Sequence, residues 1–404
     1  MFFSKNLNKK IFKVLGLSCL VTALVIGPSL LGNHLDFLEH LFLGNTTYAQ
    51  AAAQGSEEGK INVTKMVLGA LAGLVLFLYG VTRMAEGLKE ISGDRAKKIL
   101  SKFTTNPFAG VLTGTVATTV LDSSSVTIIM VIAMVSAGLL TFVQSLGVVM
   151  GSNIGTTIGA QIIAFEINQY APIALLIGAG LHFFGKTERQ KHIGLVVFGV
   201  GLLFFGLDAI GDAMKPLEKY EPFINWMKTL GQNPLWGAGI GALFTILVQS
   251  SSATVGIVVT LASQGLIPLS AGIALMLGAE VGTCADTLVA TIGRSRGAVR
   301  TGIFHLLFNL TTAAIGLTFA NQLAQLAQWI SFGADVPRQI ANAQLIFNLV
   351  GVALFIGFTP AIARGLSMLI PHGDSECDRQ DESEVEDDAN SEAHLNQRQQ
   401  HSNK

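Results

Sequence analysis

The chain has 404 residues, of which 13% are charged and 50% are hydrophobic. Soluble globular proteins average about 25% charged residues, so too few charges are present to cover the surface of a soluble protein of this size. The chain is therefore expected to be an all-α polytopic membrane protein. Its three cysteines lie far apart, at positions 19, 284 and 377, which argues against a disulfide framework and against a structural zinc or iron–sulfur site.

The two ends of the chain differ from its body. Four lysines at positions 5 to 13 precede an apolar run at 14–31, and Ala49-Gln50-Ala51 resembles a cleavage site. Residues 1–62 are therefore expected to hold a signal peptide or an anchor helix, followed by an extracytoplasmic linker. Residues 371–404 carry ten acids, three basic residues and almost nothing apolar, so this acidic tail is expected to be disordered.

Apolar segments of membrane-spanning length follow one another through the body of the chain. A helix needs roughly 20 apolar residues to cross the hydrocarbon core. The candidate spans are residues 63–82, 142–164, 171–184, 193–211, 268–292, 301–320 and 340–360. Two longer apolar stretches, 107–140 and 234–267, are interrupted at their middle by Asp122-Ser123-Ser124-Ser125 and by Gln249-Ser250-Ser251-Ser252. Each is expected to form a broken, re-entrant helical hairpin whose polar break faces a cavity rather than lipid.

Three basic stretches predict the orientation in the membrane. Lys and Arg cluster at residues 83–102, 185–192 and 293–300, which are expected to be loops on the cytoplasmic side. The spans between these stretches allow all three to lie on that side. The N-terminus and the acidic tail then also lie in the cytoplasm, and the expected location is the plasma (inner) membrane.

The body of the chain also contains an internal repeat. The two Ser-rich breaks lie 127 residues apart, and so do Gly151-x-x-x-Gly155-Thr156 and Gly278-x-x-x-Gly282-Thr283. Under the expected topology the two copies run in opposite directions, and such inverted repeats are typical of secondary transporters. We expect repeats at 63–165 and 193–292, a connecting helix and loop at 166–192, and C-terminal helices at 293–370.

The Ser-rich breaks have side chains suited to binding ions. A broken helix presents free backbone N–H groups to an anion, whereas hydroxyl and carbonyl oxygens suit a sodium ion. Ser and Gly also allow close helix packing, but their recurrence at the same place in both repeats favours binding. The sequence contains no nucleotide-binding motif, so ATP-driven pumping is not supported.

At these residues the chain resembles the sodium/phosphate cotransporter family. Gln249-Ser250-Ser251-Ser252-Ala253-Thr254 matches the Gln-Ser-Ser-Ser mark of that family, and the resemblance covers roughly residues 63–365. It implies a secondary transporter rather than an enzyme, which imports inorganic phosphate by alternating access with sodium as the coupling ion and without a cofactor. The implied partners are phosphate, sodium and the lipid bilayer, and no nucleic acid.

By this resemblance the two Ser motifs jointly form the substrate and cation sites. The expected phosphate-binding residues are Ser123, Ser124, Ser125, Thr156, Gln249, Ser250, Ser251, Ser252 and Thr283. The expected cation-binding residues are Asp122, Thr127, Asn153, Thr254 and Glu280, and no metal other than sodium is expected.

Some positions depart from the pattern of the family or of the repeat. Asp122 stands where the family usually has Gln, Glu280 corresponds to Asn153 of the first repeat, and Cys284 to Thr157, with Asp286 nearby. Acids within a membrane are costly and usually functional. Proton coupling and another small anion as substrate are therefore alternatives, as is a regulatory membrane protein without transport. An intramembrane serine hydrolase with His305 as base is disfavoured, because no Gly-x-Ser-x-Gly elbow occurs.

Overall fold

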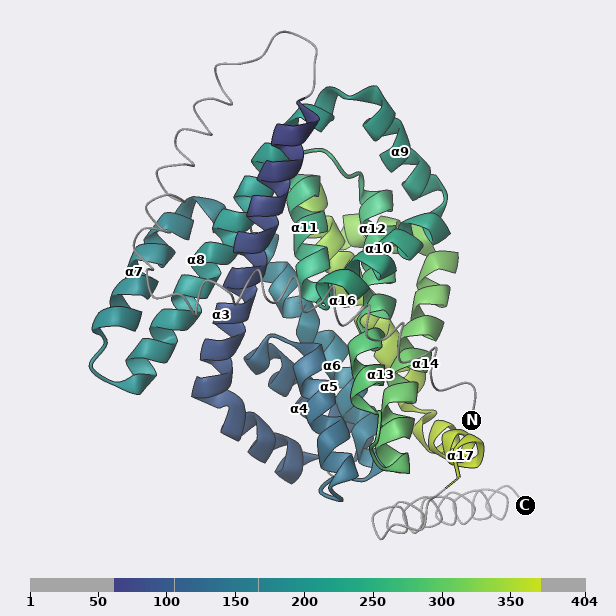
Figure 1. The fold of residues 1–404 in the computed structure, drawn as a ribbon. Helices are drawn as coiled ribbons and strands as arrows, with labels where there is room; N and C mark the ends of the chain where they lie inside the picture. The colour runs from purple at the N-terminus through teal and green to yellow at the C-terminus, as the bar shows by residue number, and fades with distance from the viewer. Residues whose placement is uncertain (1–61, 105, 166, 372–404) are drawn as a thin grey trace, which may run out of the picture. The chain divides into compact units, whose positions relative to one another are not determined.

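The computed structural model describes residues 62–104, 106–165 and 167–371. Within these ranges all regular structure is helical (Figure 1), and six helices are long and apolar enough to cross a membrane. The expected all-α polytopic fold is thereby confirmed. From Ala72 onward the described residues belong to one compact unit. The expected N-terminal signal or anchor segment and nearly all of the acidic tail lie outside the described residues.

Helices α3 to α8 form the first half of the chain. Their bounds are α3 (Val63–Phe103), α4 (Pro107–Leu121), α5 (Ser124–Ser136), α6 (Phe142–Ile163), the 3-10 helix η2 (Ile167–Tyr170), α7 (Ala171–Phe184) and α8 (Glu188–Met214). The rest of the chain comprises η3 (Lys215–Lys219), α9 (Glu221–Gln232), α10 (Pro234–Val248), α11 (Ser251–Ser263), α12 (Leu269–Gly282), α13 (Cys284–Ala290), α14 (Arg296–Thr318), α15 (Ala320–Ile330), α16 (Val336–Ile356) and α17 (Thr359–Leu369).

Both apolar stretches with a polar break form the predicted broken hairpins. One consists of α4 and α5, and the other of α10 and α11. Asp122 and Gln249, at the two breaks, adopt left-handed backbone conformations with φ of 49° and 58°. Ser123 and Ser250 then cap the second helix of each hairpin. The Ser123 hydroxyl accepts the Val126 N–H and the Ser250 hydroxyl accepts the Ala253 N–H, both at 3.2 Å. The polar cluster thus ends one helix and starts the next.

Glycines allow close contact between equivalent helices in the two halves of the chain. A Cβ at Gly151 of α6 would overlap the carbonyl oxygen of Val111 on α4, and a Cβ at Gly278 of α12 would overlap that of Ala238 on α10. Both partners of the second contact lie 127 positions after those of the first. Helix packing is therefore repeated together with the sequence motif. The opposite orientation of the two copies and the domain boundaries stay predictions.

Helices α6, α12 and α13 lie at the centre of this packing. Along the most apolar part of the candidate spans, 72% of residues are buried in α6 and 67% in the span formed by α12 and α13, against 44% in α16. The two Gly-x-x-x-Gly-Thr elements lie on these central helices. The motif residues are thus surrounded by protein rather than placed on the outer face.

The expected loops and two expected spans differ from the structure. The expected span 171–184 forms α7, which has 14 residues and is not among the six helices long and apolar enough to cross a membrane. The basic stretch 83–102 is helical, since α3 continues to Phe103; its Lys, Arg, Glu and Ala residues favour a helix and no proline interrupts it. The other two basic stretches are partly helical, because α8 begins at Glu188 and α14 at Arg296. The expected span 268–292 is interrupted at Thr283, which separates α12 from α13.

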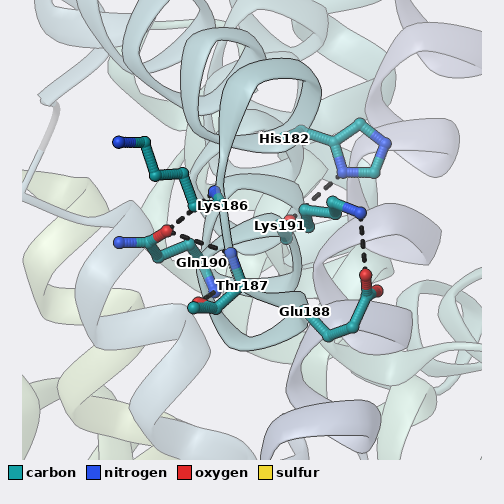
Figure 2. Close-up of polar contacts among 6 residues, drawn as sticks. All are labelled: His182, Lys186, Thr187, Glu188, Gln190 and Lys191. Carbon is teal, nitrogen blue, oxygen red and sulfur yellow. Dashed lines mark hydrogen bonds and ion pairs between the residues drawn. The ribbon is translucent and has the colours of Figure 1, made fainter.

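The connection between α7 and α8, which lie side by side (Figure 1), is short and well capped. Figure 2 shows the capping box: the Thr187 hydroxyl accepts the Gln190 N–H at 3.2 Å, and Gln190 Oε1 accepts the Thr187 N–H at 3.2 Å. Lys191 pairs with Glu188 at 2.7 Å, and His182 Nδ1 lies 3.2 Å from the Lys191 carbonyl oxygen. The ion pair is exposed and contributes little, so the capping box is the main local constraint.

Candidate ion and substrate site

Each hairpin break places a helix N-terminus among hydroxyl groups. Helix α5 begins at Ser124 and α11 at Ser251, and both serines are buried. The first backbone N–H groups of a helix have no carbonyl one turn earlier to bond, and the helix dipole adds positive potential there. The two helix starts therefore suit the oxygens of a small anion.

The first break contacts the second half of the chain. Ser125 Oγ lies 3.5 Å from Thr283 Oγ1, at the outer limit of a hydrogen bond. On α13, Oδ1 of Asp286 accepts the Thr287 N–H at 2.7 Å. The structure therefore brings together two of the expected substrate residues from different repeats. Asp286, which was not among the expected site residues, follows Thr283 by three positions on α13.

The two expected cation ligands Thr127 and Thr254 hold their own hairpins together. Thr118 donates to Thr127 at 2.9 Å, and Thr245 donates to Thr254 at 2.7 Å, so each pair links the two helices of one hairpin. Thr127 and Thr254 then donate to the carbonyl oxygen of the capping serine, both at 3.0 Å. A hydroxyl has one hydrogen and two lone pairs, so one lone pair of each remains for a cation.

The two residues in left-handed conformation have different surroundings. Asp122 is half-buried, and its Oδ1 lies 3.1 Å from the position that a Cβ at Gly159 of α6 would occupy. Gln249 is exposed. Among the described residues none donates a hydrogen bond to the Asp122 carboxylate, which leaves both its oxygens available to an ion.

A separate polar cluster connects α6, α12, α14 and α16. The Asn153 side-chain N–H₂ donates to Asn309 Oδ1 at 3.1 Å, and the Asn309 N–H₂ donates to the Glu280 carbonyl oxygen at 2.9 Å. Glu280 Oε1 accepts from Gln344 at 2.7 Å and from Asn348 at 3.4 Å. The expected cation ligands Asn153 and Glu280 are thus linked through Asn309. Gln344 was missed, although its spacing of four residues from Asn348 places both on one face of α16.

His305 orients this cluster. Its Nδ1 lies 2.8 Å from Thr287 Oγ1, and its Nε2 lies 3.0 Å from the Asn309 N–H₂. The Thr287 hydroxyl donates its hydrogen to the Cys284 carbonyl oxygen at 3.0 Å, so Nδ1 donates to Thr287 and Nε2 accepts from Asn309. The imidazole therefore fixes the Asn309 amide. It contacts no serine among the described residues, so the hydrolase alternative gains no support.

Comparison with known proteins shows the family of the chain. The sequence profile of a family described as Na+/Pi-cotransporter matches residues 76–212 and 217–367. YqeW of Bacillus subtilis is 29% identical over 76% of this chain and 99% of its own length. YjbB of Salmonella typhimurium, named for inorganic phosphate export, is 26% identical over 75% of this chain and 56% of its own length, so the chain spans about half of that relative. Human sodium-dependent phosphate transport protein 2B is 36% identical over 24% of this chain and 15% of its own length. No solved structure matches.

Proposed function

Since the chain belongs to the Na+/Pi-cotransporter family, we propose that it imports inorganic phosphate together with sodium by alternating access in the plasma membrane. The family resemblance inferred from the Gln-Ser-Ser-Ser motif is confirmed by the matched profile, and the family is one of transporters rather than enzymes. Phosphate as substrate follows from the family and from the names of two of the relatives. Sodium coupling and the direction of transport are part of the proposal.

The contact between Ser125 and Thr283 carries this proposal most directly. It joins the tip of one hairpin to the interruption between α12 and α13, and both residues present hydroxyls. Hydroxyl donors and helix N-termini bind phosphate oxygens without requiring a fixed positive charge. We therefore assign phosphate to the region of the two breaks, with contacts from Ser123 to Ser125, Thr156, Gln249 to Ser252 and Thr283.

Asp122 is assigned to the coupling ion at the first break. At about 4 Å and an effective dielectric of 20, an uncompensated carboxylate repels each unit of phosphate charge by about 4 kcal/mol. A sodium ion between the carboxylate and the phosphate removes this repulsion and makes binding of one depend on the other. The remaining lone pairs of Thr127, on the same hairpin, and of Thr254, on the second hairpin, are proposed as further oxygen ligands.

The direction of transport follows from the coupling. A symporter moves phosphate along the combined gradient of both solutes, and an inward sodium gradient therefore drives import. The name of YjbB favours export as the competing direction. Reversing the sodium gradient across a vesicle membrane distinguishes obligatory coupling from export that does not require sodium.

The test uses the full chain reconstituted in liposomes. Uptake of labelled phosphate is measured under an inward sodium gradient, under an equal potassium gradient and with sodium on the inside only. We expect uptake with outside sodium and efflux with inside sodium. Ser251→Ala at the second break should reduce uptake, while Ser263→Ala, at the far end of the same helix, should not. Equal uptake in sodium and potassium would refute the coupling.

A further inference from the structure

Glu280 is a buried acid without a positively charged partner. Its side chain is 1% exposed and lies on α12, at the centre of the helical body. The two groups that donate to its carboxylate are neutral amides, those of Gln344 and Asn348. Within the part of the chain that the structure describes, no Lys, Arg or His forms an ion pair with it. A buried charge of this kind is costly unless it is paired or neutralised.

The same cluster contains amide oxygens that lack a hydrogen-bond donor. Asn153 Oδ1, Gln344 Oε1 and Asn348 Oδ1 are buried and have no partner among the described residues. All three residues are at most 1% exposed. Leaving a buried acceptor unsatisfied is unfavourable, and native proteins do so rarely. Gln344 and Asn348 contact the Glu280 carboxylate, and Asn153 is linked to Glu280 through Asn309. Three unsatisfied oxygens in one buried cluster with this acid indicate that a positively charged group belongs there.

The helix that carries Glu280 adds to the negative electrostatic potential around this acid. Glu280 lies in the last turn of α12, which ends at Gly282, and the C-terminal end of a helix is its negative pole. The corresponding residue of the first repeat, Asn153, lies in the interior of α6, which continues to Ile163. The acid is therefore found in the repeat whose helix is interrupted, where a cation gains most from the helix dipole.

We propose that Glu280, with the side-chain oxygens of Asn153, Gln344 and Asn348, forms a buried sodium-binding site, distinct from the hairpin break at Asp122. The proposal rests on the function proposed above, because it assigns a second coupling ion of the same transporter. One carboxylate and three neutral oxygens match a hard cation of single charge. No group of three or more His, Cys, Asp and Glu residues capable of holding a metal occurs among the described residues, which disfavours a divalent ion.

A proton on Glu280 would satisfy the cluster less well. It would neutralise the charge, but a single O–H donor can satisfy only one of the three amide oxygens. A cation can be shared among the carboxylate and several amide oxygens. His305 and Cys284 do not supply the charge either, because His305 is neutral in this hydrogen-bond arrangement and the thiol contacts only neutral groups.

The direct test measures sodium binding without phosphate or transport. Full-length protein in detergent is unfolded thermally while sodium chloride replaces choline chloride at constant ionic strength and pH, with potassium chloride in parallel. Because a ligand that binds the folded state raises the unfolding temperature, the wild type should show a saturable rise with sodium. Glu280→Gln should need at least tenfold more sodium for the same rise. Glu218→Gln, which removes an exposed acid from η3, should behave as the wild type.

Two further variants keep the test decisive if Glu280→Gln fails to fold. Gln344→Leu and Asn348→Leu retain the carboxylate but each remove one oxygen ligand, and each should weaken the sodium response at least threefold. An unchanged sodium response in the variants that fold would overturn the site. A wild type that is stabilised by lower pH but not by sodium would also overturn it, in favour of a protonated Glu280.

Phosphate uptake separates this proposal from the proposed function. If sodium stimulates uptake with the same concentration dependence in the wild type and in Glu280→Gln, the buried site is wrong and sodium coupling stands. If the wild type takes up phosphate without sodium, yet sodium stabilises it in a manner that requires Glu280, the coupling is wrong and the binding site stands.

Discussion

Ser125 Oγ and Thr283 Oγ1 lie 3.5 Å apart although the two residues are separated by 158 positions in the chain. The contact joins the first turn of α5 to the residue at which α12 gives way to α13. Both hydroxyls can donate to a phosphate oxygen while remaining close to each other. The two repeats therefore meet at groups that neither repeat supplies alone.

A double-mutant cycle tests whether these two hydroxyls act on phosphate together. Ser125→Ala and Thr283→Val should each lower the apparent phosphate affinity about two- to tenfold, the range expected for one hydrogen bond. Because the hydroxyls share a ligand, the double variant should lose less than the product of the two single losses. Sodium-driven uptake as a function of phosphate concentration measures each constant.

The matched control is Thr318→Val, which removes an exposed hydroxyl whose hydrogen bond stays within α14. It should leave the phosphate affinity unchanged. If the losses of phosphate affinity caused by Ser125→Ala and Thr283→Val simply multiply in the double variant, the two hydroxyls serve different steps.

The close approach of α10 and α12 predicts that alanine substitutions at Gly278 and at Gly239 have different effects on stability. Gly278→Ala places a methyl group against the carbonyl oxygen of Ala238, so the helices must separate, at an expected cost of about 1–3 kcal/mol. Gly239→Ala, on α10 beside Ala238, meets nothing within 4 Å. It should be neutral or stabilising, since Ala favours a helix over Gly by up to about 1 kcal/mol. Thermal unfolding in detergent measures both, and equal destabilisation would contradict the packing.

The sequence predicted features that depend on local pattern. Polar clusters within apolar stretches predicted both hairpin breaks. The recurrence of Gly151 as Gly278 indicated an internal repeat, and the structure shows that the close helix contact at these glycines recurs with it. The continuation of α3 was missed, because charged residues were interpreted as a loop although they also favour helices. The interruption at Thr283 was missed because its repeat partner, Thr156, lies within the continuous helix α6.

The polar cluster around Glu280 shows a different limit. Asn153 and Glu280 were expected to bind a cation by the family resemblance. The structure links them through Asn309 and adds Gln344 from a helix outside both repeats. Contacts between distant helices depend on tertiary packing, which one sequence without helix positions does not specify.

Accessibility of introduced cysteines tests the inverted arrangement. In a variant without Cys19, Cys284 and Cys377, single cysteines at Asn106 and Asn233 should react with a membrane-impermeant maleimide from opposite sides. The expected topology places the start of α4 on the cytoplasmic side and the start of α10 on the other. A cysteine at Arg189, in the basic stretch at the start of α8, is expected to label from the cytoplasmic side. Labelling of Asn106 and Asn233 from the same side would refute the inversion.

Asp122 and Gln249 occupy the same left-handed position at the two breaks, which allows an exchange at nearly constant backbone geometry. Asp122→Gln should retain phosphate transport, because Gln already ends α10 in this conformation. The variant loses a carboxylate that has no hydrogen-bond donor among the described residues and that we assign to sodium. Its apparent sodium affinity should therefore fall about tenfold or more, since interactions of a charged group are worth about 1.5–3 kcal/mol.

Sodium activation of phosphate uptake and the charge moved per cycle, recorded on solid-supported membranes, measure this effect. Gln249→Asp is the reciprocal variant and adds a carboxylate at the second break. It should weaken phosphate binding, because the new charge has no assigned cation and repels the anion. If Asp122→Gln instead kept the sodium dependence and the charge moved but lost a strong pH dependence, Asp122 would carry a proton rather than contact sodium. Coupling at the first break would then be to protons, while phosphate binding by the Ser motifs would be unaffected.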